Sequence, residues 1–362
     1  MRPTWAEIDL EAVKHNFSVV KELVGKGVGV LSVVKADGYG HGAVEVSKAL
    51  VESGTDMLGV ATVEEAMELR DYGIEVPVML LGGIRPEEAG IAFQNNMLPC
   101  LFSMEVARAL DKAASANGKK ALYHLKIDTG MTRLGVRPEE LTGFLEELSE
   151  LKNIRMDGIL THLASAFTES PDYTEHQLSH FIGHIQTVRQ FHHSPRYVHT
   201  ANSASVIRFP GSHMDLVRPG IMLYTAGENE SLGLRPAMKL KSRIIQIRSV
   251  PAGTPVSYGG TFVTGRPSVI ATLPLGYADG YLRRLSNRAH VSVNGVTAPV
   301  AGTVCMDLTM IDVTDVPGLK VGDEVTLFGD SLVSVERVAD WAETISYEIL
   351  SITGKRVPRI YL

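Results

Sequence analysis

Short apolar stretches alternate with amphipathic stretches along the first 220 or so residues of the chain. The amphipathic stretches have helical spacing and lie at residues 63–72, 86–95, 103–117, 138–150 and 174–191. Ser103 is a good N-cap and Pro86 suits a first helical turn. The apolar stretches are typical of strands buried on both faces and lie at residues 28–34, 57–60, 76–81, 97–102, 121–127, 156–160, 197–200 and 216–217.

Eight strands that alternate with helices indicate a parallel sheet, and eight is the number that closes a (β/α)₈ barrel of the TIM type. The alternative is an open, doubly wound sheet. We favour the barrel because no G-x-G-x-x-G motif follows the first apolar stretch.

The pattern changes near residues 231–236. Beyond this point, short β-rich runs are separated by Gly, Pro and Asp, at residues 239–248, 268–273, 290–293, 303–313 and 323–328, before a helical pattern at 335–350. Such runs predict an antiparallel β domain. We therefore expect a barrel over residues 11–232 and a β-rich C-terminal domain over 233–362. The segment 1–10 joins this second domain, and we expect residues 3–10 to pair with its sheet.

Composition narrows the class of protein. The chain has 362 residues, of which 44% are hydrophobic and 21% charged, and its net charge is −6. No basic run suited to nucleic acid is present, and no apolar segment is long enough to cross a membrane. Residues 1–9 lack the apolar core of a signal peptide. The two cysteines, Cys100 and Cys305, lack metal-ligand spacing. We expect a cytoplasmic protein without disulfides or a metal site.

Lys35 follows the first apolar stretch, within Val-Val-Lys-Ala-Asp-Gly-Tyr-Gly-His-Gly. Chemistry in β/α proteins occurs at the carboxyl ends of the strands. One interpretation is a reactive amine, such as a Schiff-base lysine, whose charge is weakened by burial. The other is a lysine that extends to solvent from the end of a strand.

Later strand ends carry polar groups that strands do not require. In a barrel they would meet Lys35 at one opening, and such a cationic site favours an anion. The N–H groups of Gly220 and Ile221, with the hydroxyls of Ser203 and Tyr39, would suit a phosphate near the last strands. The cationic and histidine side chains expected at this opening are Lys35, Lys126, Arg133, His162 and Arg218.

Each of these residues also has an ordinary explanation. Lys126 and Arg133 could form surface ion pairs with Asp128 or Glu139. Ser203 is a good N-cap for the following helix. His162 could be structural, Arg218 could cap a strand end, and Gly220 could serve only turn geometry. Taken one by one these explanations do not account for the common location of the residues, because five strands place such groups at the same end.

The second half of the chain offers tyrosines beside glycines. Tyr258, in Ser-Tyr-Gly-Gly-Thr-Phe, could present its phenol to a site or pack its ring at a hairpin, and Tyr277 has the same two explanations. Met306 alternates with apolar residues, so core filling is its default role. Tyr347 could simply anchor the last helix.

Taken together, these motifs resemble those of the alanine racemases, which are pyridoxal-phosphate enzymes with a (β/α)₈ barrel and a C-terminal β domain. The resemblance covers essentially the whole chain. The match to the cofactor-lysine signature around Lys35 is strong. The motifs KIDTGMTRLG, HTANSAS, RPGIMLY, SYGGTF, LPLGYADG and GTVCMD follow in the family's order.

The resemblance implies interconversion of L- and D-alanine, which supplies D-alanine for peptidoglycan, in a homodimer whose active site is shared. It implies that Lys35 binds pyridoxal 5'-phosphate and acts as one acid/base, and that Tyr258 of the partner is the other. Arg218 would face the pyridine nitrogen, with His162 linking it to Tyr258, and Lys126 could be carbamylated to brace Arg133. The other implied cofactor contacts are Tyr39, Asn202, Ser203, Gly220, Ile221 and Tyr347. The implied substrate contacts are Arg133, Tyr277, Cys305, Met306 and Asp307.

Three other functions remain open. A fold-related amino-acid decarboxylase would carry a glutamate opposite the pyridine nitrogen, and Arg218 argues against that. A non-catalytic pyridoxal-phosphate binder would not need the β domain with Tyr258. A racemase of broader specificity stays open because a pocket discriminates poorly against one added hydroxyl group.

Overall fold

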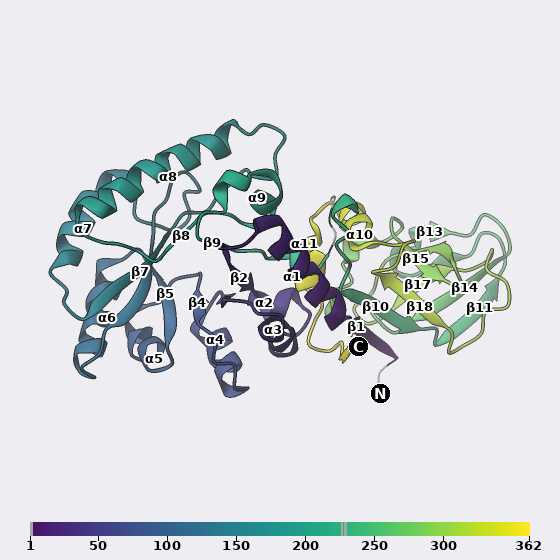
Figure 1. The fold of residues 1–362 in the computed structure, drawn as a ribbon. Helices are drawn as coiled ribbons and strands as arrows, with labels where there is room; N and C mark the ends of the chain where they lie inside the picture. Colours follow the sequence, from purple (N-terminus) through teal and green to yellow (C-terminus); the bar gives the residue numbers. More distant parts are fainter. Residues whose placement is uncertain (1–2, 226, 228–229) are drawn as a thin grey trace. The chain divides into compact units, whose positions relative to one another are not determined.

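The computed structural model describes residues 3–225, 227 and 230–362 (Figure 1). Residues 1–2 of the predicted N-terminal segment lie outside the described residues. The chain divides into two compact units. One comprises Asn16–Gly38 and Ala43–Leu223, and is called the barrel unit below. The other comprises Met1–His15, Tyr39–Gly42 and Tyr224–Leu362, and is called the β unit.

The barrel unit contains a parallel sheet of eight strands in the order β8-β7-β6-β5-β4-β3-β2-β9. The first and last strands of this order meet where the Arg218 N–H donates to Ala201 O at 2.9 Å, beside a parallel bridge between Asn202 and Arg218. The predicted barrel is therefore confirmed, and the open-sheet alternative is wrong. The strands are β2 (Gly29–Val33), β3 (Met57–Val60), β4 (Val78–Leu80), β5 (Met97–Leu101), β6 (Ala121–Lys126), β7 (Ile154–Leu160), β8 (Tyr197–His199) and β9 (Leu216–Val217).

Helices follow the strands, and Figure 1 shows α4 to α8 outside the sheet. The predicted N-cap is confirmed, because Ser103 Oγ accepts from Val106 N at 3.4 Å. Helix α1 was not predicted. The α-helices are α1 (Leu10–Val24), α3 (Ala43–Glu52), α4 (Val63–Asp71), α5 (Ala89–Gln94), α6 (Met104–Ser115), α7 (Leu141–Ser149), α8 (Asp172–Gln190) and α9 (Ser203–Arg208). Short 3₁₀ turns are η1 (Pro86–Glu88), η2 (Pro138–Glu140), η3 (Pro210–Ser212), η4 (Ile221–Leu223) and η5 (Glu230–Leu232).

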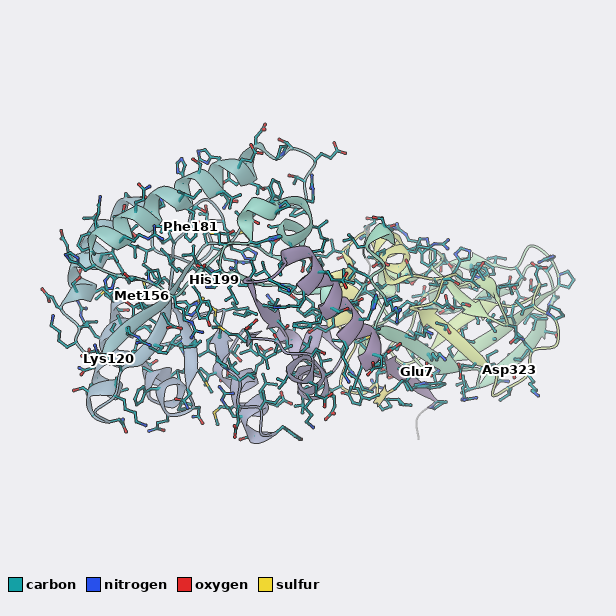
Figure 2. All side chains as sticks on the ribbon, in the orientation of Figure 1. Glu7, Lys120, Met156, Phe181, His199 and Asp323 are labelled. Atoms are coloured by element: carbon teal, nitrogen blue, oxygen red, sulfur yellow. The ribbon has the colours of Figure 1, made fainter. Side chains whose placement is uncertain are left out.

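A hydrophobic core lies between strands β5 to β7 and helices α5 to α8. Phe181 of α8 is fully buried and Met156 of β7 is buried; both are labelled in Figure 2. Burial of a side chain such as Phe181 stabilises the fold by about 1.5–3 kcal/mol. This packing fixes the strands whose carboxyl ends carry the candidate site.

The β unit contains a six-stranded sheet in the order β16-β15-β18-β10-β1-β19, a three-stranded sheet β11-β14-β17, and the pair β12-β13. Strand β1 (Thr4–Ile8) pairs antiparallel with β10, as expected for the segment 3–10. The other strands are β10 (Met238–Arg243), β11 (Gln246–Val250), β12 (Pro255–Val256), β13 (Phe262–Val263), β14 (Ser268–Leu273), β15 (His290–Val293), β16 (Val296–Pro299), β17 (Thr309–Asp312), β18 (Glu324–Phe328) and β19 (Arg359–Tyr361).

Three predicted elements of the β unit are divided or shortened. The run 239–248 forms two strands in different sheets, since Ile244 N donates to Asp323 O while Ile245 N donates to Thr272 O. The run 303–313 is a strand only at β17, because a turn precedes it in which Cys305 N donates to Leu308 O. The helix predicted at 335–350 becomes α10 (Val335–Ala342) and α11 (Ser346–Ser351), because Glu343 is left-handed with φ 55°.

Candidate active site

Five residues at the carboxyl end of the barrel form what we call the carboxyl-end cluster. Lys35 lies two residues after the end of β2, and His162 lies two residues after the end of β7. Lys126 is itself the last residue of β6. Arg218 follows β9 directly, and Arg133 lies in the loop after β6. The strand order therefore brings all five to one end of the sheet, as predicted.

The chain turns left-handed directly after Lys35, in the segment α2 (Lys35–Tyr39). Ala36, Asp37 and Gly38 have φ values of 53°, 54° and 60°. A left-handed non-glycine residue costs about 1–2 kcal/mol, so this turn needs other contacts to hold it. Ala36 N donates to Glu65 Oε1 at 2.6 Å, and Ala43 N donates to Asp37 Oδ1 at 2.9 Å. Such strain is characteristic of functional sites.

Lys35 is half-buried. Burial lowers the pKa of its amine, and the positive charge of Arg133 lowers it further, while Glu65 acts in the opposite direction. A lysine with a lowered pKa is a better nucleophile near neutral pH. The alternative of a lysine that extends freely to solvent does not fit this partly buried side chain.

Lys126 is buried, and desolvation lowers its pKa. The surface ion pairs considered for Lys126 and Arg133 are wrong for the residues that the structure describes. Asp128 instead accepts from Gly130 N at 2.9 Å and Thr132 N at 3.0 Å, and Glu139 pairs with Arg137 at 3.5 Å. Asp128 thus shapes the loop that presents Arg133, whose side chain is exposed.

Arg218 is buried and bound on its inner side. Its Nη1 donates to His199 Nδ1 at 2.8 Å, and its Nη2 donates to Thr161 O at 2.7 Å and to Thr200 O at 2.9 Å. Burial lowers the pKa of the guanidinium to about 10, which leaves it charged at neutral pH. Guanidinium has five N–H donors, so Nε and one Nη1 hydrogen remain for another acceptor. Arg218 thus binds three different residues, which is more than the capping of a strand end would require.

His162 lies within reach of the same charges. Its Nδ1 is 3.5 Å from Arg218 Nη2. Burial, followed by the charges of the four other members of the carboxyl-end cluster, lowers its pKa to about 3. The histidine is therefore neutral at working pH and does not add a fifth positive charge to the cluster.

The residues expected to bind a phosphate lie beside the last two strands. Asn202, not Ser203, is the N-cap of α9, because its Oδ1 accepts from Ser205 N at 3.1 Å. The interpretation of Ser203 as N-cap is thus wrong. Its hydroxyl oxygen instead accepts from Gly220 N at 2.8 Å. A hydroxyl that accepts can still donate its hydrogen. Ile221 begins the 3₁₀ turn η4 next to this pair.

The β unit holds the remaining predicted site residues in two groups. In the first group, the rings of Tyr39 and Tyr347 lie 6.2 Å apart, centroid to centroid. Tyr39 is buried, and its ring stacks on Tyr224 at 5.0 Å. Burial raises the pKa of both Tyr39 and Tyr347, which keeps the phenols protonated as hydrogen-bond donors.

The second group surrounds the loop of Tyr258. Tyr258 is 73% exposed, so the interpretation of a ring packed at a hairpin is wrong. Tyr277 N donates to Cys305 O at 3.0 Å, which joins two predicted motifs. Met306 is 53% exposed rather than in the core, and Asp307 accepts from Arg356 Nη2 at 2.7 Å. Tyr258 and Cys305, the residue before Met306, line the same surface hollow.

Sequence reasoning missed His199, His124 and Glu65. His199 and His124 are fully buried and belong to β8 and β6. A histidine inside an otherwise apolar strand is the signal that could have revealed them, since a buried polar group requires a partner. Nothing in the sequence around Glu65 distinguishes it from the other acids of α4.

The described residues show neither a metal-binding cluster nor a membrane-spanning helix. Residues 3–225, 227 and 230–362 contain no group of three or more histidine, cysteine or acidic side chains placed to hold a metal ion. Over the same ranges, no helix combines the length and apolar character that a membrane crossing needs.

Comparison with known proteins extends over the whole chain. Residues 8–227 match the family model "Alanine racemase, N-terminal domain", and residues 237–361 match "Alanine racemase, C-terminal domain". An alanine racemase of Halothermothrix orenii is 45% identical over 99% of this chain and 97% of its own length. A relative named alanine racemase 2, from Caldanaerobacter subterraneus, is 44% identical over 100% of this chain and 95% of its own length.

Solved structures of alanine racemases are also similar to this chain over its whole length. The alanine racemase of Clostridium difficile has a TM-score of 0.94 and 38% identity, covering 100% of this chain and 96% of that one. The Bacillus anthracis alanine racemase, solved with bound L-Ala-P, has a TM-score of 0.92 and 36% identity, covering 100% and 95%. Both family models and full-length relatives agree, and the chain belongs to the alanine racemase family.

Proposed function

We propose that this chain is a pyridoxal-phosphate-dependent racemase that interconverts L-alanine and D-alanine. The observation that carries the proposal is the full-length match to alanine racemases, 45% identical over 99% of this chain in one relative. The arrangement of the carboxyl-end cluster supports it independently.

The residues of the barrel unit fit the cofactor. Lys35 offers a half-buried amine of lowered pKa for its aldehyde. Ser203 offers a hydroxyl hydrogen for its phosphate, next to the backbone of Gly220 and Ile221. Arg218 keeps two N–H groups for its ring nitrogen. We assign Asn202 and His162 to the same site, and Tyr39 and Tyr347 as further phosphate donors from the β unit.

Racemisation needs a proton to leave one face of the α-carbon and another to arrive at the opposite face. Bound pyridoxal phosphate acidifies that proton by withdrawing electrons from the α-carbon. Lys35 would handle the proton on one face and Tyr258 on the other. Neutral His162, whose Nδ1 lies 3.5 Å from Arg218 Nη2, would connect Arg218 to the phenol of Tyr258.

Arg218 would set how strongly electrons are withdrawn. A guanidinium donates only and does not release its proton in proteins, so it would leave the ring nitrogen unprotonated. The ring would then be a weaker electron sink, which favours return of the proton at the α-carbon over side reactions such as transamination. A glutamate here would favour the opposite, and Arg218 therefore argues against a decarboxylase.

We propose a homodimer in which Tyr258 serves the partner's site. The exposure of Tyr258 and Met306, at 73% and 53%, supports a covered surface at this loop. Arg133, with Tyr277, Cys305, Met306 and Asp307, would bind the substrate carboxylate and narrow its entrance. A non-catalytic binder would not need these residues.

Four further expectations stay proposals. Lys126 would be carbamylated, because a buried lysine of lowered pKa has the neutral amine that reacts with carbon dioxide. D-Alanine made here would supply peptidoglycan, and the enzyme would be cytoplasmic. The domain limits of 11–232, and of 233–362 with 1–10, also remain predictions.

The experiment is a chiral assay. Purified protein is incubated with pyridoxal phosphate and L-alanine, and D-alanine is separated and quantified over time. We expect equal amounts of the two enantiomers at the end, reached from either side. Pyridoxal phosphate bound to folded protein without any D-alanine formed would contradict the proposal. Parallel assays with serine and with lysine test the broader racemase, and we expect slower turnover of serine than of alanine.

A further inference from the structure

A line of hydrogen bonds leaves Arg218 and runs into the interior of the barrel. Arg218 Nη1 is 2.8 Å from His199 Nδ1, and His199 Nε2 is 2.8 Å from His124 Nδ1. Both histidines are fully buried. Beyond His124, Asp157 Oδ2 lies 3.9 Å from His124 Nε2. We call these four residues the histidine chain.

The direction of every bond in the histidine chain follows from Arg218. Arginine only donates, so His199 Nδ1 must accept and the ring hydrogen of His199 is on Nε2. His124 Nδ1 then accepts in turn, and the hydrogen of His124 is also on Nε2. Burial and the charge of Arg218 lower the pKa of His124 to about 3 and that of His199 well below its usual range. Both rings are therefore neutral, with a single allowed tautomer each.

The backbone makes room for the contact between the two rings. Strand β7 lies between β6 and β8, and its Gly158 pairs with His124 on one side and Tyr197 on the other. A Cβ atom at position 158 would lie 2.4 Å from His124 Nδ1. Only glycine allows His124 to reach His199 across this strand.

The register of the same strand places Asp157. Pairing between β6 and β7 shifts between Tyr123 and His124, so that Tyr123 faces Met156, His124 faces Gly158, and Asp157 is the extra residue. A bulge of this kind re-aims a side chain. His124 Nε2 has no hydrogen-bond partner among the described residues, and its N–H lies nearest to the Asp157 carboxylate.

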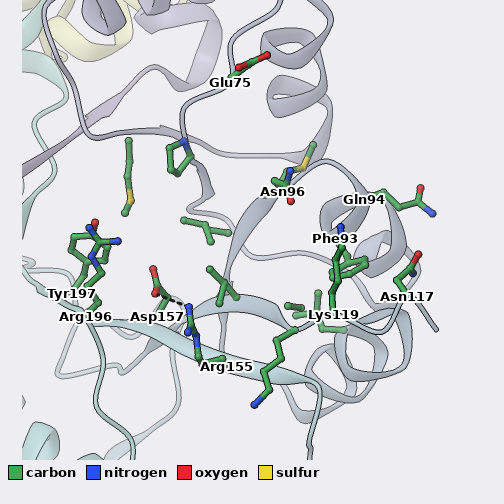
Figure 3. A pocket seen from close by; sticks show the side chains of 18 residues that line it. Glu75, Phe93, Gln94, Asn96, Asn117, Lys119, Arg155, Asp157, Arg196 and Tyr197 are labelled. Carbon is green, nitrogen blue, oxygen red and sulfur yellow. Dashed lines mark ion pairs between the residues drawn. The ribbon is translucent and has the colours of Figure 1, made fainter. Parts of the chain in front are cut away.

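The histidine chain ends at a cavity of about 760 Å³ at the amino-terminal end of the strands. Figure 3 shows Asp157 in its lining, beside Arg155, Arg196 and Tyr197. Arg155 Nη2 lies 3.8 Å from Asp157 Oδ1. The histidine chain thus spans the barrel from the candidate active site to a solvent-accessible cavity at the opposite end.

We propose that His124 and Asp157 are positioning residues for Arg218, acting through His199 from the far end of the barrel. The Asp157 carboxylate favours the hydrogen of His124 on Nε2, which leaves Nδ1 as acceptor for His199. His199 in turn keeps its acceptor toward Arg218 and fixes the guanidinium plane. This inference rests on the proposed function only in assigning Arg218 to the cofactor ring.

The first test does not depend on activity. Protein labelled with ¹⁵N-histidine is examined by NMR, and each ring nitrogen is classified as protonated or bare, with His124→Asn and His199→Asn providing the assignments. We expect Nε2 protonated and Nδ1 bare in both rings, unchanged from pH 5.5 to 8.5. A protonated Nδ1 in either ring, or a titration of either ring in this range, would overturn the proposal.

The second test uses matched variants of the holoenzyme. His124→Asn keeps an acceptor near the position of Nδ1, whereas His124→Leu removes it. We expect His124→Leu to lower kcat by about tenfold, the order that follows from loss of one buried hydrogen bond, with KM nearly unchanged. Its visible cofactor absorbance should shift and its share of transamination should rise. His124→Asn should restore all three readouts.

Asp157→Asn should shift the same absorbance in the same direction by a smaller amount, while Lys119→Gln, in the lining of the same cavity, should not. If His124→Asn and His124→Leu behave alike, the ring serves packing only and the proposal is wrong. If the wild type forms no D-alanine, the proposed function fails, yet the NMR result and the absorbance of the variants still decide the role of the histidine chain.

Discussion

The two ends of the barrel both carry basic side chains, but in different surroundings. At the carboxyl end, Lys126 and Arg218 are buried, and Arg218 donates its hydrogen bonds to His199 and to backbone oxygens rather than to carboxylates. At the amino-terminal end, Lys119 and Lys120 are exposed, and Arg155 lies beside Asp157. Buried charges without acidic partners are costly. Burial without a counter-ion therefore marks the site, whereas the number of charges does not.

The largest expected effect breaks the carboxyl end directly. Lys35→Ala removes the amine proposed to bind the cofactor and to move a proton, so racemisation should fall to background. The visible absorbance of bound pyridoxal phosphate should be lost on dialysis. Lys119→Ala, at the opposite end, is the control and should retain both. Retained absorbance in Lys35→Ala would rule out this lysine.

A second variant asks whether the barrel end is sufficient without the β unit. Tyr258→Phe removes the proposed second proton donor, and a general acid or base contributes about 10²–10⁴-fold in rate. We expect α-proton exchange in D₂O to slow to that extent, chiefly from one enantiomer, with cofactor absorbance unchanged. Tyr72→Phe, an exposed tyrosine of the barrel unit, is the control. Wild-type exchange rates in Tyr258→Phe would exclude it as a base.

A third variant tests the uncharged groups at the carboxyl end that are proposed to bind the phosphate. Ser203→Ala removes the acceptor of the Gly220 N–H and the hydroxyl proposed to bind phosphate. We expect the dissociation constant of pyridoxal phosphate to rise by about tenfold, the size of one lost buried hydrogen bond. Equilibrium titration of apoenzyme by fluorescence measures it, with exposed Ser115→Ala as control. An unchanged constant would remove Ser203 from the phosphate site.

The smallest effect is on pH dependence. The amine of Lys35 reacts with an aldehyde only when unprotonated, and its pKa is lowered by burial and by Arg133 but raised by Glu65. Arg133→Gln should therefore move the midpoint of cofactor uptake to higher pH, and Glu65→Gln to lower pH. Each shift should be less than about one unit, since solvent screens partly exposed charges. Stopped-flow absorbance after mixing apoenzyme with pyridoxal phosphate measures it, and shifts of equal sign would contradict this electrostatic account.

Much of the carboxyl end of the barrel could be predicted because the ends of its strands can be recognised in the sequence. An apolar run that stops at Lys35 or Lys126 shows both the strand and the polar residue that follows it. Less could be predicted where the conformation of the backbone determines which groups make contact. The left-handed turn after Lys35 depends on a contact with Glu65 of a different helix, and the N-cap falls on Asn202 because Ser203 has a tertiary partner in Gly220.

The histidine chain shows the same limit. His124 and His199 belong to strands β6 and β8, and only the pairing of each with β7 brings them together. The bulge that places Asp157 leaves no mark in the local sequence. Contacts across three strands are set by register, which periodicity alone does not supply.

Two lysines of lowered pKa, the half-buried Lys35 and the buried Lys126, lie at the same end of the barrel, and we assign the cofactor to Lys35 only. Borohydride reduction of the holoenzyme converts a lysine–aldehyde linkage into a stable secondary amine, which peptide mass spectrometry then locates. We predict the pyridoxyl group on Lys35 alone, with Lys126 unmodified by it. A pyridoxyl group on Lys126, or on neither lysine in protein that retains its absorbance, would contradict the account.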